Sequence, residues 1–378
     1  MRLWIGEDSE DLSLTKEILA ISNHEHFLGG GEHSFLDLLS HLPSDWQPMA
    51  VTPHEGELAA RLKQRGIATR ALPLPSIRPW TIIQVFCALN VYLRLCRKLS
   101  PSLIYANGSR AAIYGGLVGR ILRVPVLWHC RIAQSDPHLD PLLARLSTRI
   151  VTNSQATADR FSPRFQMKTS KVYNGLDIEW LQRRSVPKPS LIQDEWKIIL
   201  TVARISKWKR HDLVLSAFEQ VAESDPMLHL VCLGSIDDSE PDWWAYLQER
   251  TRVSPFSKRV HWIGHVDDVR PWYRAAYTSV LASEREPFGR VIVESMACGV
   301  PVIATRAGGV PEIICHQQDG LLVAPDSVEE LIEAIMKILQ DKFLRERLSK
   351  SAQLRAESFS LERHILNMIQ VFEQTITS

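Results

Sequence analysis

Residues 282–314 read ASEREPFGRVIVESMACGVPVIATRAGGVPEII, and this stretch decides the fold. The run TSVLA (278–282) before it predicts a buried β-strand, which leads through Pro287-Phe288-Gly289 into a helix-like segment. A second short apolar run, PVIAT (301–305), follows that helix and predicts another strand. Because strand, helix and strand follow one another, the stretch predicts a parallel sheet covered by helices.

The same alternation of strands and helices continues along nearly the whole chain. In the first half, strands are predicted at 17–22, 47–52, 67–74, 102–107, 124–129 and 148–153. In the second half, they are predicted at 197–203, 227–234, 259–264, 278–282, 301–305 and 320–324. The sequence therefore predicts an α/β protein with two Rossmann-like domains.

A Pro-rich segment at 183–195 interrupts the alternation and reads as a linker. We expect a first domain at 1–185, a second at 186–358, and a C-terminal helix at 359–378 that crosses back to the first domain. A length of 378 residues, with 45% hydrophobic and 23% charged residues, suits two folded domains.

The charges are balanced overall but unevenly distributed. The net charge of +1 gives no general attraction to nucleic acid. Residues 1–185 carry a net +6, and the interval between Glu57 and Asp136 holds twelve Lys or Arg and no acidic residue. We therefore expect an anionic partner on the first domain.

One such partner is an anionic membrane surface. The apolar run Trp80–Leu93 is followed by Arg94, Arg97 and Lys98. Basic residues beside an apolar segment favour anionic lipid by roughly 1 kcal/mol each. Ordinary core packing of a helix explains the apolar part equally well, so peripheral membrane contact is one of two readings.

The cysteines and the N-terminus predict a cytoplasmic protein. Six cysteines are scattered without a C-x-x-C pair, which is typical of reduced thiols. MRLWIGEDSEDL becomes acidic where a signal peptide needs its apolar core. The longest uncharged run, Pro79–Leu93, falls short of the ~20 residues of a spanning helix, so we expect no membrane-spanning segment.

Doubly wound sheets bind ligands beyond the carboxyl ends of their strands, which directs attention to the loops there. After the first strand, Gly30 and Gly31 precede a predicted helix and let backbone amides approach an anion, although a tight packing turn is an equal alternative. His129 ends the fifth strand, where its side chain would project toward the interdomain cleft. Its expected role is a hydrogen bond to a donor sugar, through side chain or backbone, rather than that of a base. A structural histidine is the alternative.

Basic residues follow the first strand of the second domain. Arg204 lies at the strand end and Lys209 five residues later. A planar guanidinium and a point charge can neutralise a diphosphate together without a metal ion. A solvated basic loop is the alternative for this cluster taken alone.

Glu286 and Glu294 are eight residues apart in the opening stretch. On one helix they would point about 80° apart, so they are not expected to act as a converging acid and base. We expect Glu286 just before the helix, facing a sugar, and first-turn amides of Phe288 and Gly289 facing a phosphate. Glu294 can then reach a ribose diol; a buried structural glutamate is its alternative.

Two further turns belong to the same edge of the sheet. Gly264-His265-Val266 offers backbone groups, with Val266 at a nucleobase edge, and Asp267 or Asp268 is expected to cap the next helix. Gly308-Gly309 predicts a turn that restricts the approach to the phosphates.

These motifs together resemble the family 4, group 1 glycosyltransferases of GT-B fold, along nearly the whole chain. The resemblance rests on E-x7-E with EPFG, on ESMACGVPVIAT and AGGVPEI, and on the Arg204 and Lys209 pair. Tyr173-Asn174-Gly175-Leu176-Asp177 and Asp319-Gly320-Leu321-Leu322-Val323 match as well.

The resemblance implies a role for each residue. Glu286 would lie near the anomeric centre, Glu294 would bind the ribose, Arg204 and Lys209 would clamp the diphosphate, and His129 would match the histidine after the fifth strand. It also implies a hexose-type nucleotide sugar as donor, UDP or GDP type, with front-face attack and retention. No metal or cofactor is implied. The acceptor would be a hydroxyl of a glycan, a lipid-linked molecule or a small molecule, as in cell envelope polysaccharide biosynthesis.

Two other functions are compatible with the same fold. A sugar-nucleotide epimerase would share the ligand, but the first domain lacks its paired carboxylates. A non-catalytic sugar-nucleotide-binding protein is disfavoured because both glutamates and both cations are present.

Overall fold

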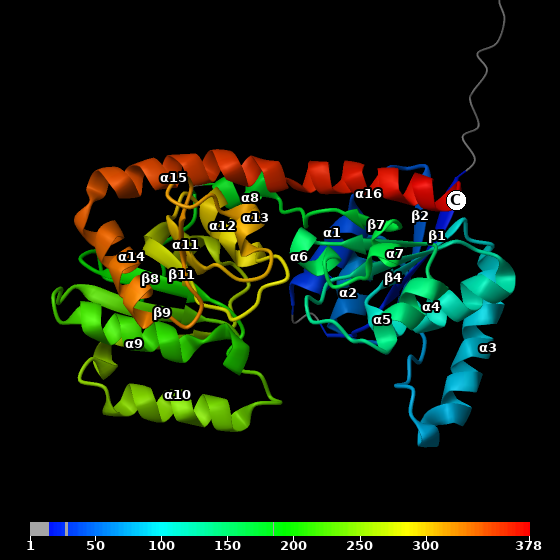
Figure 1. Ribbon diagram of the computed structural model, residues 1–378, viewed down its shortest axis with the longest axis horizontal. Helices are drawn as coiled ribbons and strands as arrows, with labels where there is room; N and C mark the ends of the chain where they lie inside the picture. Colours follow the sequence, from blue (N-terminus) through cyan, green and yellow to red (C-terminus); the bar gives the residue numbers. More distant parts are fainter. Residues whose placement is uncertain (1–14, 27–28, 184) are drawn as a thin grey trace, which may run out of the picture. The chain divides into compact units, whose positions relative to one another are not determined.

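The computed structural model describes residues 15–26, 29–183 and 185–378 and divides the chain into two compact units (Figure 1). The first unit comprises Met1–Cys130, Pro137–Ile150 and Met368–Ser378, and the second comprises Arg131–Asp136 and Val151–Asn367. The bounds of these two units differ from the domain boundaries expected from the sequence. Those expected boundaries stay predictions.

The first sheet has seven strands in the order β3-β2-β1-β4-β5-β6-β7. The strand bounds are β1 (Lys16–Ser22), β2 (Trp46–Thr52), β3 (Ala68–Ala71), β4 (Leu103–Asn107), β5 (Val126–Cys130), β6 (Arg149–Thr152) and β7 (Thr169–Lys171). The pairs β1/β2, β1/β4, β2/β3 and β4/β5 are parallel. All six predicted strands are confirmed. The strand β7 was missed because its three residues show no period and it lies at the sheet edge.

Helices follow the strands of the first sheet as predicted. They are α1 (Gly30–Ser40), α2 (Glu57–Gln64), α3 (Ile82–Leu99), α4 (Ser109–Leu122), α5 (Leu139–Leu146), α6 (Gln155–Ala158), α7 (Pro163–Gln166) and α8 (Ile178–Gln182), with a 3₁₀ turn η1 (Pro79–Thr81) before α3. In α1 the apolar residues Phe35, Leu36, Leu38 and Leu39 are buried. Their three- and four-residue spacing gives α1 one apolar face against the sheet.

The second sheet has six parallel strands in the order β10-β9-β8-β11-β12-β13. The strand bounds are β8 (Lys197–Val202), β9 (Leu228–Leu233), β10 (Val260–Gly264), β11 (Ala276–Leu281), β12 (Val302–Thr305) and β13 (Leu321–Val323). The helices are α9 (His211–Ala222), α10 (Pro241–Val253), α11 (Arg270–Ala275), α12 (Arg290–Ala297), α13 (Val310–Ile313), α14 (Val328–Gln340), α15 (Lys342–Ala356) and α16 (Leu361–Ile376), with 3₁₀ turns η2 (Lys207–Lys209), η3 (Ser257–Arg259) and η4 (Glu357–Phe359). All six predicted strands of this half are confirmed, and the chain is an α/β protein of two parallel sheets.

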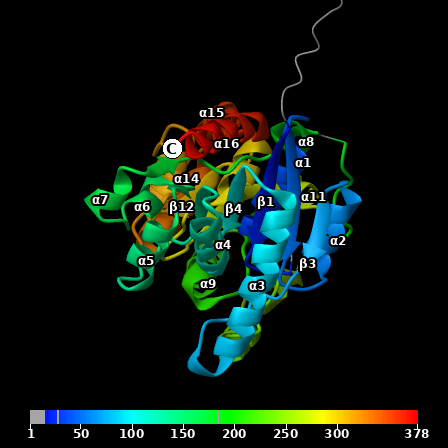
Figure 2. The same ribbon diagram turned by 90° about the vertical axis from the view of Figure 1, so that its right-hand side faces the viewer.

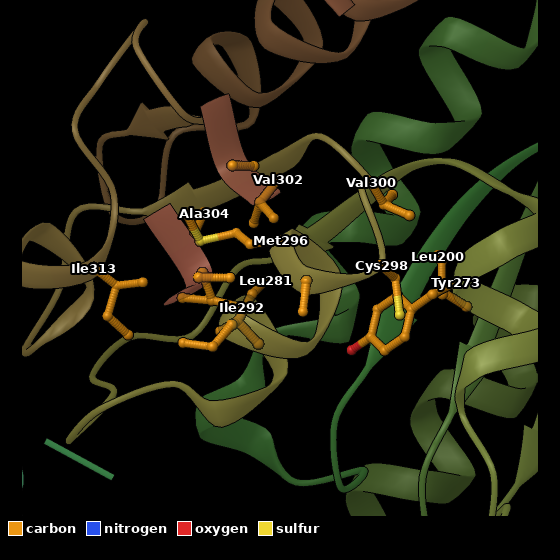
Figure 3. Close-up of a cluster of buried hydrophobic side chains, with 14 of the residues drawn as sticks. Leu200, Tyr273, Leu281, Ile292, Met296, Cys298, Val300, Val302, Ala304 and Ile313 are labelled. Carbon is orange, nitrogen blue, oxygen red and sulfur yellow. The ribbon is translucent and has the colours of Figure 1, made fainter. Parts of the chain in front are cut away.

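A large apolar core fixes α12 on the second sheet (Figure 3). Ile292 and Met296 of α12 lie near Leu281 of β11 and Val302 of β12, and Leu200 of β8 belongs to the same cluster; all five side chains are almost fully buried. Burying a side chain of this size contributes roughly 1.5–3 kcal/mol. The core therefore holds rigidly the helix that follows the loop containing Glu286.

The C-terminal helix α16 has residues in both units, which confirms the predicted return to the first one. Phe372 packs on Trp46 with ring centroids 5.4 Å apart, and Lys16 pairs with Glu373. These contacts fix the last turns of α16 to β1 and β2.

The first turns of α16 pack against the segment that follows β7. A Cβ added to Gly175 would lie 2.5 Å from Cβ of His364, so only glycine allows this approach. His364 Nδ1 lies 2.6 Å from the Tyr173 carbonyl oxygen and therefore donates to it. Burial, together with the nearby charge of Arg131, lowers the pKa of His364 to about 3.

This histidine predicts a loss of stability in mild acid. Its folded-state pKa lies below the unfolded value of 6.5, so the unfolded chain binds the proton more readily and stability falls as pH drops below about 6.5. Between pH 7 and pH 5 we expect this group to cost about 2 kcal/mol. His364→Asn keeps the hydrogen bond but cannot titrate, so thermal unfolding of this variant should lose less stability over that interval. The same substitution at exposed His54 should change nothing; identical pH profiles for His364→Asn and the parent chain would contradict the assignment.

Helix α3 is much less buried than a core helix. Only 28% of its most apolar window is buried, and within the described residues it is the one helix, Pro79–Leu99, whose length and composition would allow it to cross a membrane. The expectation of no membrane-spanning segment counted the uncharged run alone, whereas the helix continues through Arg94, Arg97 and Lys98; that expectation stays a prediction. Length and composition are weak evidence of spanning, because core helices and signal sequences share them.

Candidate functional site

Four loops of the second unit follow the carboxyl ends of neighbouring strands, where ligands of doubly wound sheets bind. They cover 203–210 after β8, 234–240 after β9, 265–269 after β10 and 282–289 after β11. Most of the candidate residues predicted from the sequence lie in these loops or directly after them.

Lys209 and Glu286 form an ion pair that joins two of these loops. Lys209 Nζ lies 2.5 Å from Glu286 Oε2, and each side chain is 11% exposed. The Ser283 hydroxyl donates to the same oxygen over 3.4 Å, and the Trp208 ring lies 4.0 Å from Nζ. Attraction between charges is stronger in such a poorly hydrated position than in bulk water. The pair therefore holds the cation and the carboxylate at a single point.

Further contacts fix the backbone around this pair. The Glu284 amide donates to the Trp208 carbonyl oxygen over 2.9 Å. Arg210 donates from Nε to Asp212 over 3.0 Å and also pairs with Asp326. The hydrogen bond that Arg210 donates to Asp212 raises the pKa of the Arg210 guanidinium. The two loops consequently form one connected structure.

The turn at Gly308 and Gly309 lies directly on the backbone of Glu286. Gly309 donates its amide hydrogen to the Glu286 carbonyl oxygen over 2.8 Å. Gly308 has φ +58°, and a Cβ there would lie 2.2 Å from the same oxygen. The predicted turn is present, and in the described structure it supports Glu286.

Helix α12 begins later than predicted. Its first residue is Arg290 and its N-cap is Gly289, with φ 103°. Phe288 is 2% exposed and packs on Tyr173 and Phe359, with ring centroids 5.9 and 5.7 Å away. The expected helix start was therefore wrong, because the left-handed glycine delays the helix. That the amides of Phe288 and Gly289 face a phosphate stays a prediction. The first-turn amides are those from Arg290 onward.

Glu294 lies in the second turn of α12 and is half-buried. The Tyr273 hydroxyl lies 3.5 Å from Glu294 Oε2 and donates to the Val291 carbonyl oxygen over 3.0 Å. Burial raises the pKa of Tyr273 well above its usual value, so it stays a neutral donor. Glu286 and Glu294 thus come from different elements, a loop and a helix.

Arg204 follows β8 and forms an ion pair with a different carboxylate from the one that Lys209 contacts. Its side chain is 42% exposed, and Nε lies 3.5 Å from Asp237 Oδ2 in the loop after β9. Hydrogen bonding from the Ser239 hydroxyl lowers the pKa of Asp237, and Arg204 adds to that effect. Joint action of Arg204 and Lys209 on one diphosphate stays a prediction.

The loop after β10 combines open backbone with a capped helix. Gly264 has φ +85°, and a Cβ there would meet no atom within 4 Å. Val266 packs partly against the core, and the N-cap of α11 is Val269. Of the two aspartates considered as caps, Asp268 accepts from the Arg270 amide over 3.0 Å. That carboxylate therefore serves the helix start.

In the first unit, His129 is the penultimate residue of β5 and is fully buried. Its Nδ1 lies 2.8 Å from the Tyr105 hydroxyl, and the two ring centroids are 5.9 Å apart. The structure thus places His129 in the interior of its own unit. The predicted contact with a sugar stays a prediction.

Gly30 and Gly31 form the first turn of α1 instead of preceding it, because the N-cap is Gly29. Buried Glu32 lies in the same turn, and its carboxylate would be 3.1 Å from a Cβ at Gly29. A carboxylate is stabilised at such a helix start.

Several contributors to the site were missed in the sequence. Trp208 lies against Lys209, Glu284 joins the loops, and Glu240 accepts from the Lys207 amide over 2.6 Å. The acidic run after β9 could have been found, because it follows a strand that the sequence predicted. The contacts of Trp208 left no signal in the sequence.

Two family models match adjacent parts of the chain. The model described as glycosyl transferases group 1 matches residues 182–355. The model described as glycosyltransferase family 4 matches residues 28–180. Together they cover most of both units and include every candidate residue of the site.

Two curated relatives show the extent of the similarity. Mannosylfructose-phosphate synthase of Agrobacterium fabrum is 33% identical over 43% of this chain and 37% of its own length. Spore coat protein SA of Bacillus subtilis is 29% identical over 60% of this chain and 65% of its own length. The chain thus spans between about a third and two thirds of the length of these relatives.

A solved structure covers almost the whole fold. HepE of Anabaena, in complex with UDP and glucose, superposes with a TM-score of 0.82 at 24% identity, over 94% of this chain and 99% of that one. Identity at this level shows the fold alone. Taken with the two family models and the loops that join Lys209 to Glu286, the matching architecture leads to one conclusion: this chain belongs to the family 4, group 1 glycosyltransferases of GT-B fold.

Proposed function

We propose that the chain transfers a hexose-type sugar from a nucleoside-diphosphate sugar to a hydroxyl of a glycan, a lipid-linked molecule or a small molecule. The observation that carries the proposal is the buried Lys209–Glu286 pair at the carboxyl ends of β8 and β11. A cation and a carboxylate at one point suit a ligand that brings a diphosphate and sugar hydroxyls together. The complex of HepE with UDP and glucose supports a UDP-type donor, with GDP as the other candidate.

In this proposal the donor replaces the internal ion pair. The diphosphate attracts Lys209 and Arg204, which releases the Glu286 carboxylate to accept hydrogen bonds from the sugar. Glu294, on the next helix, accepts from the ribose diol. The predicted roles of Gly30, Gly31 and His129 belong to the same hypothesis. As the diphosphate departs, cations held in place stabilise its growing charge.

We further propose that transfer proceeds with retention and without a metal ion. The support is chemical: Arg204 and Lys209 supply the positive charge that a metal would otherwise bring to the leaving diphosphate. Activity is then expected to survive EDTA, and the anomeric configuration of the product, read by NMR, should match that of the donor.

Binding to a panel of nucleotides tests the donor class. UDP, GDP and ADP, each alone and as the glucose conjugate, are compared by thermal shift and calorimetry. Sugar release is then measured with and without candidate acceptors. Selective binding of one nucleotide supports the proposal, whereas epimerised donor in the absence of any acceptor would favour the epimerase. Binding without turnover over all acceptors would favour a non-catalytic protein.

Lys209→Ala is expected mainly to weaken nucleotide binding. Loss of one charge-assisted contact to phosphate costs roughly 1.5–3 kcal/mol, or about 10- to 150-fold in the dissociation constant of UDP. Calorimetry with UDP measures the change. Lys207→Ala is the matched control, because this exposed lysine lies in the same turn and meets no described carboxylate through its side chain. An equal loss in both variants would contradict the role of Lys209.

A cytoplasmic location, with the first unit at the inner face of a membrane, completes the proposal. Nucleotide sugars require a compartment that supplies them, and all six cysteines are free thiols. The basic interval of the first unit supports peripheral contact with anionic lipid.

A further inference from the structure

The outward face of α3 begins with a row of exposed apolar side chains. Trp80 and Ile83 are each 75% exposed, Phe86 is 62% exposed and Ile77 is 47% exposed. The spacing of three residues places Trp80, Ile83 and Phe86 along one side of η1 and α3, and Ile77 precedes η1. Contiguous exposed apolar side chains of this size mark an interaction surface rather than ordinary scatter.

The opposite face of α3 carries the buried side chains through which the helix packs on the first unit. Val85, Ala88, Tyr92 and Leu95 are buried, and Tyr92 lies 5.7 Å from Tyr114 between ring centroids. Since these residues form a complete apolar stripe, the exposed row is additional to the core. Within the first unit, the start of α3 also projects beyond the other elements in both views (Figures 1 and 2).

Basic side chains continue the outward face after the apolar row. Arg94, Arg97 and Lys98 are exposed and form no ion pair with any carboxylate in the described ranges. Arg94 lies about 16 Å along the axis from Ile83 at 1.5 Å per residue. At the other end, the Arg78 guanidinium stacks over the Trp80 ring, 5.5 Å from its centroid.

The charge of this surface identifies its occupant. The interval from Leu58 to Gln134 contains no acidic residue, so every Lys, Arg, Asp or Glu that this interval contributes to the surface is basic. A two-fold contact between two copies would bring the same arginines together, which is unfavourable. An anionic lipid bilayer offers apolar depth for the row and phosphates for the arginines.

We infer that the start of α3 docks this protein on an anionic membrane surface. Trp80, Ile83 and Phe86 enter the boundary between headgroups and acyl chains, where amphipathic helices are buried by about 5–10 Å. The distance along the helix leaves Arg94, Arg97 and Lys98 at the phosphates. The inference deepens the membrane contact in the proposed function and does not depend on the chemistry at Lys209 and Glu286.

Vesicle flotation with the full chain tests this docking. Vesicles of phosphatidylcholine alone are compared with vesicles that contain phosphatidylglycerol. The parent chain should bind only the anionic vesicles. The triple variant Trp80→Glu, Ile83→Glu, Phe86→Glu should lose about 100-fold or more in partitioning, because burial of each large apolar side chain contributes roughly ten-fold.

A matched triple variant controls for added charge and lost apolar surface. Phe343, Leu354 and Leu366 are 85%, 77% and 67% exposed in the second unit, and their replacement by Glu should leave binding unchanged. Arg94→Glu, Arg97→Glu, Lys98→Glu should reduce partitioning by more than about 100-fold, since each basic residue contributes about five-fold. Lys258→Glu, Lys342→Glu, Lys350→Glu makes the same change in net charge and should have little effect.

The two exposed cysteines locate the contact directly. Cys87 lies on α3 and Cys315 in the second unit. An environment-sensitive fluorophore on Cys87, in a Cys315→Ser background, should shift to shorter wavelength with anionic vesicles. The same fluorophore on Cys315, in a Cys87→Ser background, should not.

Defined outcomes overturn the inference. Equal binding to neutral vesicles, equal shifts at both cysteines, or unchanged binding of the apolar triple variant would each refute it. A dimer seen by light scattering that this variant dissociates would assign the surface to a second copy. UDP binding, measured by calorimetry, tests the donor site separately. It should be unchanged in the triple variants. Its absence in the parent chain would contradict the proposed donor site and leave the membrane inference untouched.

Discussion

Glu286→Ala should almost abolish transfer, by about 100- to 1,000-fold in kcat, while the fold remains intact. The substitution removes the carboxylate that we assign to the sugar, and preorganised polar groups at a reacting centre are commonly worth 10²–10³-fold. It also leaves the nearly buried Lys209 ammonium without its partner at 2.5 Å. We therefore expect a lower melting temperature without ligand, and a larger stabilisation by UDP than in the parent chain, because the diphosphate replaces the lost negative charge.

Two variants make this expectation specific. Glu284→Ala lies in the same loop, and its carboxylate approaches Arg210 only to 3.8 Å, so transfer should persist. Glu286→Gln keeps the size of the side chain but removes its charge, and should resemble the alanine variant. Full transfer by Glu286→Ala, or equal stabilisation of it and the parent chain by UDP, would refute the assignment.

Gly308→Ala should eliminate both transfer and nucleotide binding. The new Cβ would lie 2.2 Å from the carbonyl oxygen of Glu286 and 2.9 Å from its amide nitrogen, and both are backbone atoms that cannot rotate away. The loop containing Glu286 must move, which separates its carboxylate from Lys209. Calorimetry with UDP and a transfer assay measure the loss.

Gly66→Ala separates this displacement from simple backbone strain. Gly66 has φ +76°, close to the +58° of Gly308, but a Cβ there meets no atom within 4 Å. Both variants bear the strain of a left-handed residue, roughly 1–2 kcal/mol, yet only Gly308→Ala disturbs the site. Normal UDP binding by Gly308→Ala would show that Glu286 does not depend on this turn.

The sequence predicted the strands well because parallel buried strands are continuous apolar runs with clear ends. Strand β7 (Thr169–Lys171) escaped because three polar residues at an edge carry no such signal. The start of α12 was misplaced because Pro287 and Phe288 look like a helix opening, whereas Gly289 adopts φ 103° and delays it. Local spacing cannot reveal a left-handed residue.

The individual residues of the candidate site could be predicted from the sequence, but the contacts between them could not. Lys209 and Glu286 were each found from their position after a strand, yet their contact joins residues 77 positions apart. Similarly, the apolar start of α3 could be recognised in the sequence. Its exposure could not, because it depends on which side of the helix packs against the rest of the first unit. Arg204 was expected beside Lys209, and only the structure showed Asp237 next to it.

The Lys209–Glu286 pair also bears on selectivity among anions. The carboxylate is an internal competitor, held at a high effective concentration beside the Lys209 ammonium, to which a free phosphate would also be attracted. A small anion must displace the Glu286 carboxylate from Lys209, and it leaves the displaced carboxylate without a group to bind. In the proposed function, a nucleotide sugar supplies hydroxyl groups to that glutamate at the same moment. The unliganded protein would therefore already discriminate against inorganic phosphate in the cell, before a nucleotide sugar binds.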